Sequence, residues 1–161
     1  MPAISDHIFV ARYVLGLIHT DDIIAFVDRK LSEGQYSDTY LDILDANLQT
    51  EPELAQLLET SLQDSGIDIP GLEHATWTML HYHIWLIANG SVSPKKQFGY
   101  LLSDIARIDL TKGINKYVGD KFGIEFMYGW FYNDYESDAL IDKGIKEECL
   151  KWLKSYASKH S

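Results

Sequence analysis

The sequence of 161 residues is poor in cysteine, proline and glycine. It contains one cysteine, Cys149, so no disulfide can form within the chain, which fits a reducing cytoplasm. Only 4 prolines and 11 glycines interrupt it, and no low-complexity segment or linker divides it. We therefore expect a single domain that spans residues 1–161.

Long apolar runs are also missing. The N-terminal apolar stretch is interrupted by Asp6 and Arg12, and it has neither the basic start nor the small-residue cleavage site of a signal peptide. The most apolar segment, residues 72–89, contains Glu73 and three histidines and is slightly too short to span a bilayer. We expect a cytoplasmic protein that does not act at a membrane.

Basic residues are scarce in the first half of the chain. Residues 1–80 contain three basic and fourteen acidic residues, a balance of −11, whereas residues 81–161 contain eleven and ten, a balance of +1. This acidity argues against nucleic acid or an anionic membrane as partner, because like charges repel. It favours a basic protein partner, whose approach it would accelerate, although an acidic balance also simply keeps a protein in solution.

Apolar residues recur at helical spacing along most of the chain. Helix-capping residues precede many of these segments; Thr20 is the expected cap of the second helix, and Pro52 and Pro94 occupy first-turn positions. The aromatic segment 123–135 suits a strand, but a lone strand would have no pairing partner, so we expect a helix or an irregular segment there. The remaining predicted helices cover residues 5–18, 21–33, 37–48, 51–65, 72–89, 94–108, 111–121 and 137–158. The predicted fold is an all-α bundle of seven or eight helices.

The predicted helix 72–89 is the one on which the others are expected to pack. It has no internal proline or glycine, and Gly71 and Gly90 bracket it. Apolar and aromatic residues, among them Leu80 and Ile84, occupy most of its circumference, which is typical of a buried helix.

The histidines of this helix do not have the spacing of a metal site. His81 and His83 lie about 200° apart around the axis, and His74 lies roughly 10 Å along the axis from His81. No phosphate-binding, dinucleotide-binding or nucleophile motif is present, and Cys149 lies among apolar neighbours where its thiol should be inert. The sequence predicts no metal ligand, no cofactor and no catalytic residue, and it does not point to an enzyme.

One constellation in this helix has two interpretations. Trp77, His81 and Trp85 follow one another at intervals of one turn on the same face. They could line an aromatic pocket, which would suit a small hydrolase or a ligand-binding protein. Alternatively, His81 is a core histidine that hydrogen-bonds a carbonyl or a buried carboxylate, and we favour this second interpretation.

Two groups of acidic and aromatic residues suit a protein interface instead. The first is a carboxylate stripe on the predicted third helix, at spacing i, i+4, i+7, with two tyrosines at its start. The second belongs to the aromatic segment 123–135. The candidate partner-binding residues are Asp38, Asp42, Asp45, Tyr36 and Tyr40 in the first group and Tyr128, Trp130, Tyr132 and Asp134 in the second.

The segments DDIIAFVDRKL (21–31) and GIEFMYGWFYNDYES (123–137) resemble parts of small acidic helical immunity proteins of bacteria. Those proteins neutralise toxins of polymorphic and contact-dependent secretion systems. The resemblance implies a cytoplasmic protein without enzymatic activity that binds a cognate toxin domain, often over the toxin's active site. Because many nuclease toxins are basic, the acidic first half of the chain agrees with this function. A structural oligomer or adaptor, which would expose a large apolar patch, is a further alternative.

Overall fold

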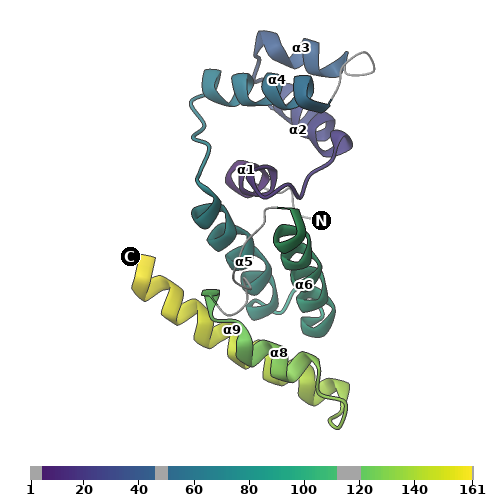
Figure 1. The fold of residues 1–161 in the computed structure, drawn as a ribbon, viewed down its shortest axis with the longest axis vertical. Coiled ribbons are helices and arrows are strands. Elements are labelled where there is room, and N and C mark those ends of the chain that lie inside the picture. The colour runs from purple at the N-terminus through teal and green to yellow at the C-terminus, as the bar shows by residue number, and fades with distance from the viewer. Residues whose placement is uncertain (1–4, 46–50, 112–120, 161) are drawn as a thin grey trace. The chain divides into compact units, whose positions relative to one another are not determined.

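The computed structural model describes residues 5–45, 51–111 and 121–160. Within these ranges it contains eight helices and no strand, which confirms the all-α class (Figure 1). The helices are α1 (Asp6–Val14), α2 (Thr20–Ser32), α3 (Asp38–Leu44), α4 (Glu51–Asp64), α5 (Leu72–Ala88), α6 (Pro94–Thr111), α8 (Glu125–Phe131) and α9 (Asp138–His160). None of the helices in the described ranges combines the length and the apolar character that a bilayer crossing requires.

Several predicted boundaries need correction. Helix α1 ends at Val14 instead of residue 18, and α6 continues to Thr111 instead of ending at residue 108. The cap of α2 is His19 and not Thr20, because the backbone amide of His19 donates to Oδ2 of Asp22 at 2.7 Å and completes a capping box. Helix α3 ends at Leu44, earlier than the predicted Leu48, and residues 46–50 lie outside the described ranges.

The aromatic segment 123–135 contains α8, so its helical interpretation is confirmed. The turn before α8 uses Gly123, whose φ of 78° lies in the left-handed region that glycine adopts readily. Most of the predicted helix 111–121 falls on residues 112–120, which lie outside the described ranges.

The chain divides into two compact units. Unit 1 consists of Met1–Leu17 and Leu72–Ser161 and contains α1, α5, α6, α8 and α9. Unit 2 consists of Ile18–Gly71 and contains α2, α3 and α4. That the 161 residues behave as one domain stays a prediction.

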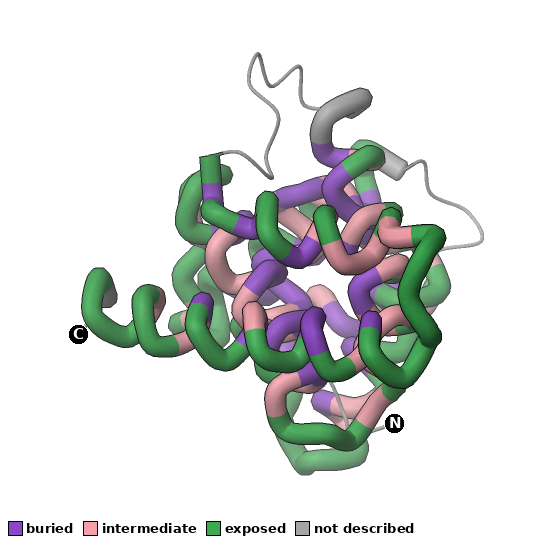
Figure 2. The backbone as a smooth tube through the Cα atoms, turned by 90° about the horizontal axis from the view of Figure 1, so that it is seen from below, coloured by how far each residue is buried: buried purple, intermediate pink, exposed green. Residues whose placement is uncertain are grey.

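Helix α5 is the centre of unit 1. Helices α1, α6 and α9 pack against it, and α8 packs against α9. Leu80 and Ile84 are fully buried, as predicted, but Trp85 on the opposite side is 48% exposed. The helix is therefore not buried all round, because its neighbours cover only part of its circumference. Figure 2 shows the same pattern in the other helices, with buried positions on one side, and the last turns of α9 are exposed almost all round.

Unit 2 has a core of its own. Phe26 and Val27 of α2, Tyr40 of α3 and Leu58 of α4 are buried, and the three helices pack against one another. Lys30 is also buried, with its ammonium group 5.6 Å from the centre of the Phe26 ring and 3.8 Å from a carboxylate oxygen of Glu33. The charge is therefore compensated where the side chain leaves water.

Candidate functional site

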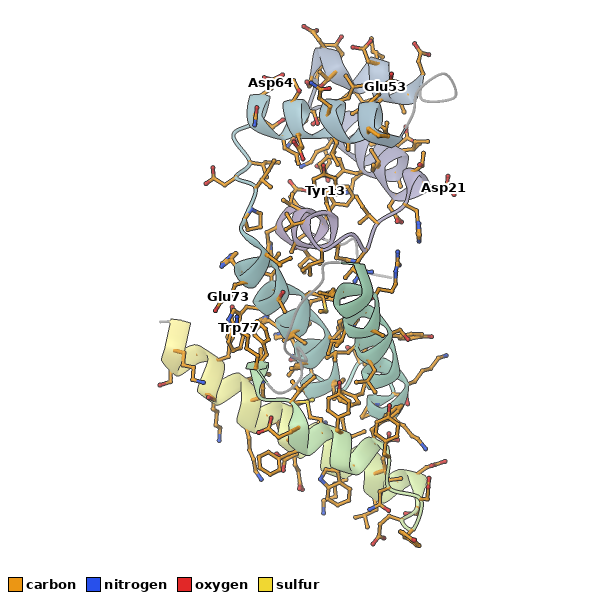
Figure 3. The ribbon with its side chains drawn as sticks, in the orientation of Figure 1. Tyr13, Asp21, Glu53, Asp64, Glu73 and Trp77 are labelled. Atoms are coloured by element: carbon orange, nitrogen blue, oxygen red, sulfur yellow. The ribbon has the colours of Figure 1, made fainter. Side chains whose placement is uncertain are left out.

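The acidity of the chain belongs entirely to unit 2. Residues 18–71 contain twelve acidic and two basic residues, a net charge of −10, whereas unit 1 contains twelve of each. Eleven of the twelve carboxylates have described side chains, and every one of these is exposed; in Figure 3, Asp21, Glu53 and Asp64 project outward from α2 and α4. We call this set the acidic surface of unit 2: Asp21, Asp22, Asp28, Glu33, Asp38, Asp42, Asp45, Glu53, Glu59, Asp64 and Asp68.

The two basic residues of unit 2 do little to offset this surface. Arg29 lies 3.6 Å and Lys30 3.8 Å from carboxylate oxygens of the same residue, Glu33. Lys30 is only 3% exposed, so its charge is largely withdrawn from the surface. A partner that approaches unit 2 therefore meets a strongly negative potential.

Helix α3 carries the predicted carboxylate stripe. Asp38, Asp42 and Asp45 are all exposed, and Tyr36, immediately before the helix, is 63% exposed. Tyr40 is only 2% exposed, so its candidate role as a surface anchor is wrong: its position places its ring in the core of unit 2. The sequence reasoning also missed Leu41, which is 53% exposed and lies on the same face as the three carboxylates. Leu41 follows Asp38 by three residues, and this spacing could have predicted that the two side chains share a face.

The second predicted group lies in unit 1 and is only partly at the surface. Tyr132 and Asp134 are exposed, whereas Tyr128 and Trp130 are half-buried against the core. The Tyr128 ring meets the Phe98 ring edge to face at a centroid distance of 5.7 Å. Trp130 packs so tightly on Gly144 of α9 that a side-chain carbon there would overlap its ring. These two residues therefore join helices, and Tyr132 and Asp134 are the members of this group that a partner can reach.

Within the part of the chain that the structure describes, Trp77, His81 and Trp85 do not line a pocket together, so the pocket interpretation is wrong for two of the three residues. A cavity of 330 Å³ in unit 1 is lined by Trp77, while Trp85 is not part of its wall. The His81 ring lies next to one wall residue, Tyr156, at a centroid distance of 4.8 Å. Partial burial, and to a smaller degree the nearby His7, lower the pKa of His81 below its ordinary value of 6.5.

Aromatic rings from three parts of unit 1 form this cavity. Trp77 of α5 meets Phe122 edge to face at 4.6 Å and lies 5.7 Å from Trp152 of α9, measured between ring centres. Trp152 stacks on Tyr156 at 5.2 Å, and its indole nitrogen donates to the carbonyl oxygen of Phe122 at 2.9 Å. Figure 3 shows the Trp77 side chain on the side of α5 that faces α9. The spacing i, i+4 of Trp152 and Tyr156 was visible in the sequence, but their meeting with Trp77 depends on tertiary packing.

Lysines occur at the same cavity. Lys121, Lys151 and Lys159 line it, together with the single carboxylate of Glu148. The combination of stacked rings and ammonium groups was not predicted, because Lys121 and Trp77 come from segments far from the α9 residues Lys151 and Lys159.

Unit 1 contains a buried polar network with a core histidine, but this histidine is not His81. His83 is 4% exposed, and its Nε2 lies 2.8 Å from Oδ2 of Asp104 on α6. Arg12 of α1 donates to the same oxygen at 2.8 Å, and Nδ1 of His83 lies 2.7 Å from the side-chain amide of Gln97. The core histidine bonded to a buried carboxylate is thus His83, and the prediction that it is His81 is wrong.

This network controls the ionisation of Asp104. Burial by itself would raise the pKa of the carboxyl group, but hydrogen bonds from His83 and Arg12 and the positive charge of Arg12 lower it below the ordinary value of 3.8. Asp104 is therefore a carboxylate at neutral pH and joins three helices of unit 1 through α1, α5 and α6.

Cys149 is buried, and burial followed by the charge of Glu148 raises the pKa of its thiol to about 12. The thiol is therefore protonated at neutral pH and a poor nucleophile, as the sequence predicted. Across the described parts of the chain, no three histidine, cysteine or carboxylate side chains lie close enough together to hold a metal ion.

The structure thus defines an all-α protein with two helical units, an acidic surface on one and an aromatic cavity on the other. Comparison with known proteins finds no matching family model, no similar curated protein and no similar solved structure.

Proposed function

We propose that this protein neutralises a toxin in the cytoplasm, as immunity proteins do, by binding a basic toxin domain on the acidic surface of unit 2. The observation that supports this most is the location of the charge. All of the net charge of −10 belongs to unit 2, and every described carboxylate of that unit is exposed. Such a field attracts a basic protein and orients it before contact.

Charge alone gives a fast encounter but little specificity, so a binding surface also needs anchors. Tyr36 and Leu41 supply two exposed apolar groups beside Asp38, Asp42 and Asp45. A ring and an aliphatic side chain surrounded by carboxylates suit a partner that presents arginine or lysine around a shallow apolar depression. The proposed contact surface is therefore centred on α3.

The maintenance of like charges on α3 also supports a binding role. Carboxylates one turn apart on a helix destabilise it by a few tenths of a kcal/mol per pair. Asp38 and Asp42 stand in this relation. The repulsion between the two carboxylates opposes folding, whereas the attraction of a basic partner uses both charges.

The proposal predicts that the reading frame immediately upstream encodes a toxin domain, which is the partner to test. Expression of that domain should stop bacterial growth, and co-expression of this protein should restore it. Failure of the rescue, or the absence of a complex between the purified proteins, would reject the toxin-neutralising function.

The role of α3 is tested by association kinetics. We expect the triple variant Asp38→Asn, Asp42→Asn, Asp45→Asn to associate about tenfold more slowly at low salt, with a flatter dependence on salt. A matched control is the triple variant Glu125→Gln, Glu136→Gln, Glu147→Gln, which removes three exposed charges from unit 1. If both triple variants slow association equally, the effect is one of net charge and α3 is not the contact surface.

The anchors are tested by dissociation. Tyr36→Ala and Leu41→Ala leave the charge intact, so we expect the association rate to stay the same and the dissociation rate to rise. An unchanged dissociation rate in both variants would place the contact elsewhere, and Tyr132→Ala in unit 1 would then be the next variant to measure.

A further inference from the structure

The aromatic cavity of unit 1 is built before any ligand arrives. The rings of Trp77, Phe122, Trp152 and Tyr156 hold one another through centroid distances of 4.6 to 5.8 Å. The hydrogen bond from the Trp152 indole nitrogen to the Phe122 carbonyl oxygen holds both residues in place. Because these two polar groups are already paired, a ligand can enter without leaving either of them unsatisfied. A preformed wall lowers the entropic cost of binding.

The wall has both π faces and positive charge. Lys121, Lys151 and Lys159 line the cavity with one carboxylate, that of Glu148. Lys151 lies 3.1 Å from Glu148, and Lys121 lies 3.5 Å from Glu73 with both side chains largely exposed. The Lys121–Glu73 pair is exposed on both sides and therefore weak, so the Lys121 ammonium group can turn toward a bound anion. The Lys151 side chain is itself 73% exposed, although Glu148 is only 19% exposed. With three lysines against one glutamate, the lining keeps a net positive charge.

The volume limits the size of the ligand. A cavity of 330 Å³ is at the lower end of the range for small-molecule sites, which is about 300 to 1,000 Å³. One ring or two fused rings with a single charged group fit such a space. We propose that this cavity binds a small planar aromatic anion, whose ring lies against the wall formed by Trp77, Trp152 and Tyr156 and whose carboxylate or phosphate contacts the lysines.

This inference does not depend on the proposed toxin-binding function, because it concerns the other unit and a different class of ligand. The probes are 1-naphthyl phosphate, 1-naphthoate and the neutral 1-naphthamide, titrated into the full-length protein by calorimetry and by tryptophan fluorescence. We expect one phosphate or carboxylate probe to bind per chain, and the amide to bind at least tenfold more weakly. Equal binding of the three probes, or no saturable binding of any of them at millimolar concentration, would overturn the proposal.

The position of the site is tested by filling it. Ser155 lines the cavity and is exposed, so Ser155→Trp adds a ring to the space without removing a packed side chain. We expect this variant to keep the unfolding transition of the wild type and to lose binding of 1-naphthyl phosphate. Undiminished binding in a folded Ser155→Trp variant would place the probe elsewhere and reject the site.

The charge is tested by two lysines of α9. Lys151 lines the cavity, whereas Lys154 is exposed and is not part of the wall. Lys151→Gln should weaken binding of 1-naphthyl phosphate at least threefold, and Lys154→Gln, which makes the same change in net charge on the same helix, should leave it unchanged. Equal weakening in the two variants would show a general charge effect and contradict the assigned contact.

Discussion

The two units of this chain differ in what they do with charged residues. Unit 1 has as many basic as acidic residues, and it buries some of them in a hydrogen-bonded network around Asp104. Unit 2 has a net charge of −10, and all of its described carboxylates face water. In unit 1 charge connects helices, whereas in unit 2 it lies at the surface. The comparison fits the proposed binding role of unit 2.

The same difference should appear in stability. Unit 2 has 54 residues, and a unit of that size gains few kcal/mol from its core. Its carboxylates also repel one another, which lowers stability further, most of all at low salt. We therefore expect unit 2 to be the less stable of the two, and the predictions below test this comparison, beginning with the largest effect.

The largest effect is expected in the core of unit 1. Ile84→Asp places an unpaired charge at a position with no solvent exposure and should lower the free energy of unfolding by more than about 4 kcal/mol. Hydrogen exchange should show loss of protection in α5, α6 and α9, while α2 and α4 keep theirs because unit 2 has its own core. The neighbouring Trp85→Gln, at a half-exposed position, is the control and should change stability little. Near-native stability of Ile84→Asp would contradict the central place of α5.

The second prediction concerns the network of unit 1. Asp104→Asn removes the charge that pairs with Arg12 and should cost about 2 to 3 kcal/mol at pH 7 in urea unfolding. Because the pKa of Asp104 is lowered in the folded protein, its contribution is present above pH 3.8 and is lost as the pH falls further. The difference in stability between wild type and variant should therefore shrink below pH 3.8. Glu125→Gln, at an exposed position, is the control and should show no such difference at either pH.

The third prediction uses two helical glycines of unit 1. Gly144→Ala would drive a methyl group into the Trp130 ring, so we expect a loss of roughly 1 to 3 kcal/mol despite the better helix propensity of alanine. Gly129→Ala on α8 meets nothing within 4 Å and should stabilise the protein by about 0.5 to 1 kcal/mol. Thermal unfolding measures both. Equal changes in stability for the two variants would show that the Trp130 ring does not need the space left by glycine at position 144.

The smallest effect is expected at the two ends of α3 in unit 2. Asp38 lies in the first turn, where a negative charge is favourable, and Asp45 directly follows the last turn, where it is unfavourable. Asp38→Asn should therefore lower stability and Asp45→Asn should raise it, each by about 0.3 to 1 kcal/mol at low salt. Both differences should fade in 0.5 M salt, which roughly screens such charges. If both variants change stability in the same direction, the net charge of unit 2 has a larger effect than the position of each carboxylate along α3.

Sequence reasoning was most successful where the relevant contacts are local. Apolar spacing, capping residues and first-turn prolines depend on neighbours within one or two turns, and they predicted the helices well. The burial of Tyr40 could have been read from its spacing of three residues to Ile43, which is also buried. The exposure of Leu41 follows from the same local pattern.

The features that were missed depend on residues far apart in the sequence. Arg12 and Asp104 are separated by 92 residues, so nothing local could identify Asp104 as the partner of either Arg12 or His83. The choice between His81 and His83 as the core histidine needed the position of α6. The cavity likewise requires Trp77 and Trp152 to meet across helices that are not adjacent in the chain.

The order of the units along the chain has a consequence for how the protein forms. Unit 2 is inserted between α1 and the rest of unit 1, so α1 can reach α5 only after a loop of 54 residues has been closed. For a flexible chain the length-dependent part of this closure costs about 3.5 kcal/mol. A folded unit 2 holds the two ends of the insertion at a fixed separation and removes much of that search. During synthesis, unit 2 is also complete before α6 and α9 exist. We therefore expect the folding of unit 2 to shorten the search by which α1 reaches α5, and mutations in α2 to α4 should slow the docking of α1 even where they leave the finished unit 1 unchanged.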